Sequence, residues 1–118
     1  MTTTLDLIRH GEPVGGRMYR GGIDHPLSDL GWQQMRDATA QPESWQYIIS
    51  SPLARCRDFA EELADRLGLD CTVDQRLQEV GFGRWEGKTG AQLREEDPDQ
   101  LRRFYQDPVA HRPEGAER

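Results

Sequence analysis

The stretch Leu5-Asp6-Leu7-Ile8-Arg9-His10-Gly11-Glu12 holds the residue types best suited to chemistry. Residues 5–8 lie in a short apolar run of β-prone side chains, which stops at Arg9, His10 and Gly11. This pattern predicts a buried strand that delivers a cation and an imidazole to its C-terminal end, where open α/β sheets bind ligands. We expect Gly11 to let the backbone turn sharply and a ligand approach closely.

A second strand-to-helix junction carries another cation. The apolar run 47–50 predicts a strand, and Ser51 and Pro52 are suited to begin a helix directly after it. Arg55 falls in the first turn of that helix, off its apolar stripe, where its guanidinium could reach the crevice of His10. The free N–H groups at the start of the helix would also favour a nearby anion.

A carboxylate follows in a turn-rich segment. Glu79 precedes the run from Val80 to Gly87, which contains Phe82 and Trp85. We expect the two aromatic residues to pack and hold this loop rather than to contact a ligand.

These motifs resemble the histidine phosphatase superfamily, which has the phosphoglycerate mutase-like fold. The matching runs are Arg9-His10-Gly11-Glu12, Asp24-His25-Pro26-Leu27-Ser28-Asp29-Leu30-Gly31, Ser50-Ser51-Pro52-Leu53-Ala54-Arg55, Leu77-Gln78-Glu79 and Phe82-Gly83-Arg84-Trp85-Glu86-Gly87. The resemblance covers essentially the whole chain. It implies an α/β protein, a three-layer α/β/α sandwich with a mostly parallel sheet, in which residues 1–118 form a single domain whose C-terminal part is missing.

The resemblance implies phosphomonoester hydrolysis through a phosphohistidine. His10 would attack phosphorus with a neutral ring nitrogen while its other nitrogen donates to a backbone carbonyl. Arg9 and Arg55 would hold the phosphoryl oxygens. Glu79 would protonate the leaving oxygen and then deprotonate the water that hydrolyses the phosphohistidine. We expect no metal and no other cofactor, since the arginines supply the positive charge.

The loop after the first predicted strand is expected to contact the substrate. In the family this loop wraps the phosphate and part of the leaving group, which implies Gly11, Glu12, Arg20 and Gly21 as substrate-binding residues. An exposed loop arginine without a binding role remains the alternative for Arg20.

The segment 105–118 is expected to form a substrate-side loop. In the family that loop leads into further elements, one of which carries a second catalytic histidine, and His111 lies in the wrong context to replace it. We therefore expect the N-terminal portion of a longer protein, with the activity of this chain open. The alternatives are phosphoglycerate mutase-type phosphoryl transfer and a non-catalytic phosphate-binding fragment.

Within the family, the short run Phe82–Gly87 resembles the phosphatase branch. It is most similar to α-ribazole phosphatase-like proteins of cobalamin biosynthesis, which implies α-ribazole 5′-phosphate as a substrate. The mutases have a lysine in the region where this chain has Gly90.

The remaining pattern predicts mainly helices. Helices are expected from a Ser28 cap to about Gln41, from about Leu53 to Leu67, and over 89–96 and 98–106, with a further strand over 69–73. The expected core face of the second helix consists of Leu53, Cys56, Ala60, Leu63, Ala64 and Leu67.

Composition narrows the class of protein further. The chain has 118 residues, of which 31% are charged and 35% hydrophobic, and a formal net charge of −6. These values argue against a membrane protein and against a nucleic-acid partner. We expect a cytoplasmic protein with two reduced thiols, which binds a small-molecule phosphomonoester. An unpaired sheet edge would favour association, with a homodimer as one outcome.

Overall fold

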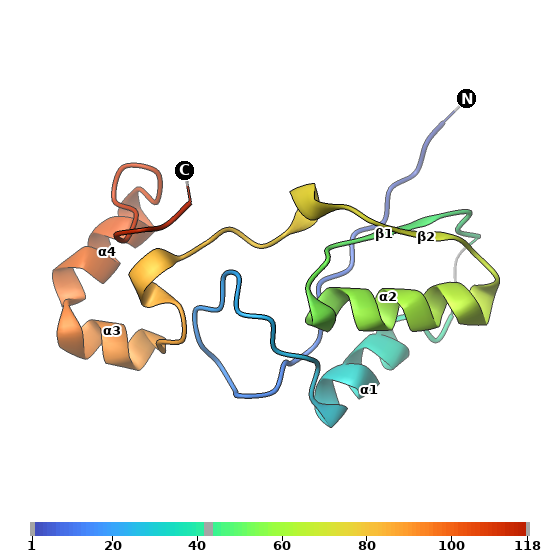
Figure 1. Cartoon of the computed structure of the whole chain (residues 1–118), viewed down its shortest axis with the longest axis horizontal. Coiled ribbons are helices and arrows are strands. Elements are labelled where there is room, and N and C mark those ends of the chain that lie inside the picture. Colours follow the sequence, from blue (N-terminus) through green and yellow to red (C-terminus); the bar gives the residue numbers. More distant parts are fainter. Residues whose placement is uncertain (1, 42–43, 118) are drawn as a thin grey trace.

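The computed structural model describes residues 2–41 and 44–117 and has a mixed α/β architecture (Figure 1). The elements are α1 (Asp29–Ala38), β1 (Ile48–Ser50), α2 (Ala54–Leu67), β2 (Cys71–Val73), α3 (Gly90–Glu96) and α4 (Pro98–Gln106), with short 3₁₀ turns at Gln75–Leu77 and Gly83–Trp85. β1 and β2 pair in parallel, with Ile48 opposite Cys71. The predicted α/β class and parallel sheet are confirmed.

Helix ends follow the capping residues in most places. The Ser28 side chain accepts a hydrogen bond from the Gly31 N–H at 3.0 Å and begins α1 as predicted. α2 ends at Gly68, whose φ of 68° is the left-handed conformation that glycine adopts without strain. The prediction that Ser51 caps α2 is wrong: the helix begins after Leu53, and Asp24 Oδ1 accepts the Ala54 N–H at 2.6 Å.

One hydrophobic core lies between α1 and α2. Its buried residues are Leu27, Met35, Phe59 and Leu63, against which Trp32, Trp45, Ile48 and Leu67 pack. The expected core face of α2 is only partly right. Cys56 and Leu67 are half-buried, whereas Phe59, which the pattern did not select, is 1% exposed.

A second core holds α3 and α4 together at the other end of the molecule (Figure 1). It is built from Trp85, Leu93 and Leu101, with Tyr19, Phe82 and Phe104 around them. The packing role predicted for Trp85 and Phe82 is confirmed. Thr89 and Gln92 form a capping box at the start of α3, and Asp97 caps α4.

The strand predicted for residues 5–8 is wrong. Among the described residues β1 pairs only with β2, and the segment 5–8 takes part in no sheet. Leu5 is 77% and Leu7 88% exposed. A strand requires hydrogen-bonding partners along its edge, and the described sheet supplies none here. Nearby, the Trp45 indole N–H donates to Asp6 at 2.7 Å.

The terminal segment packs against the loop that contains Phe82. Phe82 and Ala116 form an antiparallel bridge, and the Glu117 N–H donates to the Gly81 carbonyl at 2.9 Å. The predicted loop 105–118 begins later than expected, since residues 105–106 belong to α4. Of the helices that the structure describes, none has the length and apolar character needed to cross a membrane.

Two glycines allow the segment that carries His10 to lie directly on the start of α1. A Cβ atom at Gly11 would lie 2.3 Å from the Gly31 carbonyl oxygen, and a Cβ at Gly31 would lie 2.1 Å from the Glu12 carbonyl oxygen. Gly11 does not have a positive φ. Gly11 is needed here for a close approach of two backbones, and the sharp turn expected at this glycine stays a prediction.

This contact predicts that Gly31→Ala destabilises the fold. The added methyl group would force the backbone segments apart, and such overpacking costs about 1–3 kcal/mol. The measurement is urea unfolding followed by circular dichroism. Gly90→Ala is the control, because its Cβ would meet no atom closer than 4.0 Å. A Gly31→Ala midpoint equal to that of Gly90→Ala would contradict the prediction.

Candidate active site

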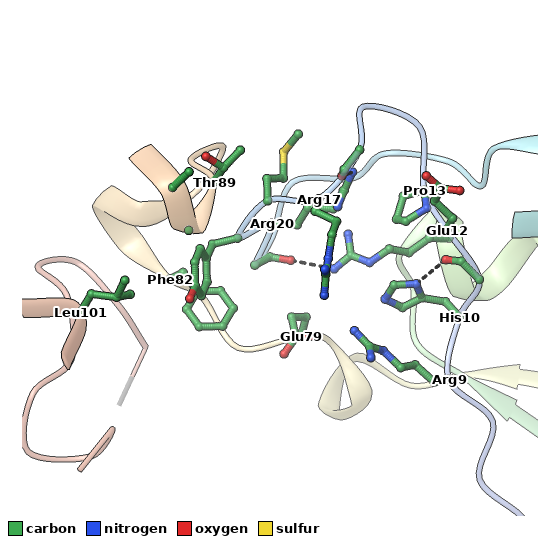
Figure 2. Close-up of a pocket in the computed structure, with 18 of the residues that line it drawn as sticks. Arg9, His10, Glu12, Pro13, Arg17, Arg20, Glu79, Phe82, Thr89 and Leu101 are labelled. Atoms are coloured by element: carbon green, nitrogen blue, oxygen red, sulfur yellow. Dashed lines mark hydrogen bonds between the residues drawn. The ribbon is translucent and has the colours of Figure 1, made fainter. Parts of the chain in front are cut away.

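A cleft of about 1070 Å³ lies between the N-terminal loop, the start of α2 and the α3–α4 pair. All eight residues predicted for the site line it: Arg9, His10, Gly11, Glu12, Arg20, Gly21, Arg55 and Glu79. In Figure 2 the side chains of Arg9, His10 and Glu79 point toward one common space. Residues far apart in the sequence therefore meet around a single cavity.

The imidazole of His10 is held in one tautomer. Its Nδ1 lies 2.7 Å from the carbonyl oxygen of Gly11, and the ring is half-buried (Figure 2). Because a carbonyl oxygen only accepts, Nδ1 must carry the proton and donate. In the neutral imidazole, Nε2 is then the ring nitrogen with a free lone pair. The predicted backbone-carbonyl contact is present, and it is the arrangement that a nucleophilic imidazole requires.

Arg55 is the most buried cation of the cleft, with 2% of its surface exposed. Its Nη1 donates to the Ile23 carbonyl at 2.7 Å and its Nη2 to the Gly21 carbonyl at 3.1 Å. These two bonds fix the plane of the guanidinium, which has five N–H donors in all. The structure shows no other hydrogen bond from this guanidinium to a described residue, and Arg55 lines the cleft.

Arg20 is buried and binds the glycine-rich loop of residues 12–22. Its Nη2 donates to the Val14 carbonyl at 2.8 Å and to the Gly16 carbonyl at 2.5 Å, and its Nε donates to His25 Nδ1 at 3.2 Å. Burial lowers the pKa of Arg20 from its ordinary value, and the nearby Arg55 guanidinium adds to this lowering. The alternative of an exposed loop arginine is therefore wrong. The hydrogen bonds of Arg20 to Val14 and Gly16 therefore stabilise the conformation of this loop.

Gly21 shapes the same loop. Its φ of 53° is left-handed, and a Cβ there would lie 2.2 Å from Glu86 Oε1. That carboxylate oxygen accepts the Gly22 N–H at 2.7 Å. The residue therefore has to be glycine for the loop to lie against Glu86, whether or not its backbone also meets a ligand.

Several residues that line the cleft were missed by sequence reasoning. They are Arg17, Tyr19, Gln34, Thr89, Arg94 and Tyr105, together with small and apolar neighbours. Arg17 lies in the loop that was expected to contact the substrate, and this position could have marked it as a candidate cleft residue. No sequence signal marks Arg94 as a cleft residue, because an arginine on a polar helix face is usually solvated.

The cleft is positively charged in an acidic protein. Five arginines and two glutamates line it, which gives these side chains a formal net charge of +3, against −6 for the chain. Within residues 2–41 and 44–117 none of the five arginines forms an ion pair. That part of the chain also contains no group of three or more His, Cys, Asp or Glu residues able to hold a metal ion.

Fold and site together define an α/β protein with an arginine-lined cleft, one wall of which carries the His10 imidazole. The family described as "Histidine phosphatase superfamily (branch 1)" matches residues 5–118. The chain belongs to this superfamily, as its motifs predicted.

The similar proteins include a bifunctional protein and two phosphatases. The bifunctional protein Rv2228c of Mycobacterium tuberculosis is 41% identical over an alignment of 110 residues, which covers 89% of this chain and 30% of that protein. The mycobacterial glucosyl-3-phosphoglycerate phosphatase structure has a TM-score of 0.78 at 36% identity, over 92% of this chain and 52% of that one. The α-ribazole phosphatase of Shigella flexneri has a TM-score of 0.76 at 27% identity, over 93% and 56%. The chain thus spans about half the length of these phosphatases.

Because Arg9 lines the cleft, we predict that Arg9→Gln weakens the binding of inorganic phosphate. Loss of a charge-assisted hydrogen bond should reduce affinity about tenfold or more in isothermal titration calorimetry at low salt. Arg84→Gln is the control, because Arg84 is exposed, outside the cleft, and has the same charge. Equal weakening by the two substitutions would show that only net charge matters and would contradict a site at Arg9.

Proposed function

We propose that the full-length protein is a phosphomonoester hydrolase that works through phosphorylation of His10. The observation that carries this proposal is the His10–Gly11 hydrogen bond, which engages Nδ1, so that in the neutral imidazole Nε2 is the nitrogen available for attack at the wall of an arginine-lined cleft. A neutral nitrogen nucleophile beside several fixed guanidiniums is suited to attack on a phosphoryl group.

The reaction has two displacements at phosphorus. His10 Nε2 forms the N–P bond while the P–O bond to the alcohol breaks, and Glu79 gives its proton to the departing oxygen. Water then attacks the phosphohistidine, Glu79 takes a proton from it, and the N–P bond breaks to release phosphate and free His10. Arg9 and Arg55 hold the phosphoryl oxygens in both steps, and the fixed plane of Arg55 supports this role.

Hydrolysis is favoured over mutase-type transfer, since the named solved neighbours are phosphatases. Their names suggest two first compounds to test, glucosyl-3-phosphoglycerate and α-ribazole 5′-phosphate. We would test glucosyl-3-phosphoglycerate first, because this chain is 36% identical to the glucosyl-3-phosphoglycerate phosphatase and 27% identical to the α-ribazole phosphatase. A phosphate-binding fragment without turnover stays the alternative for the 118-residue chain alone, because the chain covers only about half of these relatives.

The proposal predicts that His10→Ala abolishes phosphoenzyme formation. Incubation with 4-nitrophenyl phosphate, acid-free quenching and intact mass spectrometry should show one added phosphoryl group on the unsubstituted protein and none on the variant. The adduct should be labile to acid, as an N–P bond is. His111→Ala is the control, because His111 is an exposed histidine outside the cleft. A phosphoenzyme that persists in His10→Ala would overturn the mechanism.

A separate prediction concerns Glu79→Gln. Loss of the general acid should slow hydrolysis of an alkyl phosphate by about 10²–10⁴-fold. 4-Nitrophenolate leaves without protonation, so with that ester the first step should survive while hydrolysis of the phosphohistidine is slow. Rapid-quench kinetics should then show a burst and an accumulated phosphoenzyme.

Glu114→Gln is the matched control for this experiment, since Glu114 is exposed and outside the cleft. An equal slowing of both esters without accumulation would argue against an acid–base role for Glu79.

A further inference from the structure

The glycine-rich loop of residues 12–22 forms one wall of the cleft, which it lines with residues 12–13 and 16–21. The loop is closed at its base, where Pro13 and Leu27 form an antiparallel bridge. Above that bridge, residues 15–18 receive one hydrogen bond from the described part of the chain, from Arg20 Nη2 to the Gly16 carbonyl at 2.5 Å. The shape of this wall therefore depends on where Arg20 is held.

His25 is the side chain that holds the other edge of this guanidinium. Its Nδ1 accepts the Arg20 Nε–H at 3.2 Å. The half-buried ring also lies against the loop, since a Cβ atom at Gly15 would lie 3.5 Å from His25 Cε1. Because a guanidinium only donates, Nδ1 must be unprotonated, and His25 is neutral with its proton on Nε2. His25 does not line the cleft, so it acts on the cleft through the loop.

The charged groups around this pair are mainly positive. Arg55 from α2 lies close enough to add to the lowering of the pKa of Arg20 by burial, and Glu12 partly opposes it. Asp24 precedes His25, but its carboxylate accepts a backbone N–H at the start of α2. Within residues 2–41 and 44–117 no carboxylate forms an ion pair with His25. A positive charge on His25 would therefore have no acid paired with it.

Protonation of His25 would break its contact with Arg20. An imidazolium donates from both ring nitrogens and accepts nothing, so Nδ1–H would face the Arg20 Nε–H. The buried guanidinium would lose an acceptor and gain a like charge next to it, and both changes are costly away from water. Moving Arg20 away from His25 would also move it from the Gly16 carbonyl. Histidine is the side chain that ordinarily changes charge between pH 5 and 8.

We propose that neutral His25 is a positioning residue for the cleft, and that its protonation frees the glycine-rich loop and weakens anion binding in mild acid. The inference rests on the proposed function, because it assumes that the cleft binds a phosphoryl group. The competing explanation is that a charged His25 only adds to the positive field of the cleft. That effect has the opposite sign, since it would strengthen anion binding in acid.

The test compares the unsubstituted protein with His25→Asn. The asparagine Oδ1 can replace Nδ1 as the acceptor for Arg20, and it does not titrate. Isothermal titration calorimetry with inorganic sulfate is suited to the comparison, because sulfate is a dianion at about pH 8 and at about pH 5.5, on either side of the histidine range. His10 and Glu79 titrate in both proteins, so the ratio of the two affinities isolates His25.

The two proteins should bind sulfate equally at the higher pH. At the lower pH the unsubstituted protein should bind about tenfold more weakly than His25→Asn, the effect of losing a hydrogen bond to a charged group. His25→Leu has no acceptor and should bind about tenfold more weakly than His25→Asn at both pH values.

His111→Asn is the matched control, because it removes an exposed histidine outside the cleft. It should keep the pH dependence of the unsubstituted protein. Far-UV circular dichroism should show the same fold at both pH values. Two-bond ¹H–¹⁵N NMR spectra should show the neutral His25 ring with its proton on Nε2.

Four results would overturn the inference. They are an equal pH dependence in the unsubstituted protein and His25→Asn, a relative gain of affinity by the unsubstituted protein in acid, a neutral His25 protonated on Nδ1, and a loss of the far-UV signal in acid by the unsubstituted protein alone. The last result would show that the whole fold, rather than the loop, depends on His25.

The same experiments separate this inference from the proposed function. Failure of every protein to bind sulfate would count against the anion site and thus against both. Absence of a phosphoenzyme together with the expected ratio of sulfate affinities would count against the hydrolase alone. A phosphoenzyme on His10 without any effect of His25→Asn on the pH dependence would count against the role of His25 alone.

Discussion

The site depends on one buried cation, the guanidinium of Arg55. A charge that is 98% removed from solvent would destabilise the fold unless its hydrogen-bonding groups were satisfied. The carbonyls of Gly21 and Ile23 satisfy part of this requirement, and in doing so they bind the glycine-rich loop to α2. Arg55 also lines the cleft. The residue that shapes the loop therefore also contributes positive charge to the cavity.

The loop that Arg55 holds also joins the two hydrophobic cores. On one side it lies against α1 through the contact of Gly11 with Gly31. On the other side Tyr19 enters the core of α3 and α4, and Gly22 bonds to Glu86. The loop thus lies between the α1–α2 pair and the α3–α4 pair (Figure 1), and residues from both sides line the cleft.

The sequence correctly predicted the features that depend on residues close together in the chain. The cap at Ser28, the stop at Gly68 and the positions of α3 and α4 follow from residues within one helical turn. The apolar run at 5–8 failed as a strand, because strand formation depends on partners that no local pattern supplies. The convergence of Arg9, His10, Arg55 and Glu79 on one cleft was predicted, but from motif resemblance rather than from periodicity. Arg94 was missed because an arginine on a polar helix face has the same sequence pattern whether it faces water or a ligand.

The distribution of charge distinguishes the cleft from the rest of the chain. The chain is acidic overall, yet its cleft carries unpaired arginines and few carboxylates. Elsewhere arginine and lysine form ion pairs with neighbouring acids, as in Arg36–Glu62 and Lys88–Glu96. A cation already paired would have to lose its partner before binding an anion, and that loss would reduce affinity. Unpaired arginines in the cleft therefore favour an anion beside His10, and the net negative charge of the chain disfavours anions elsewhere.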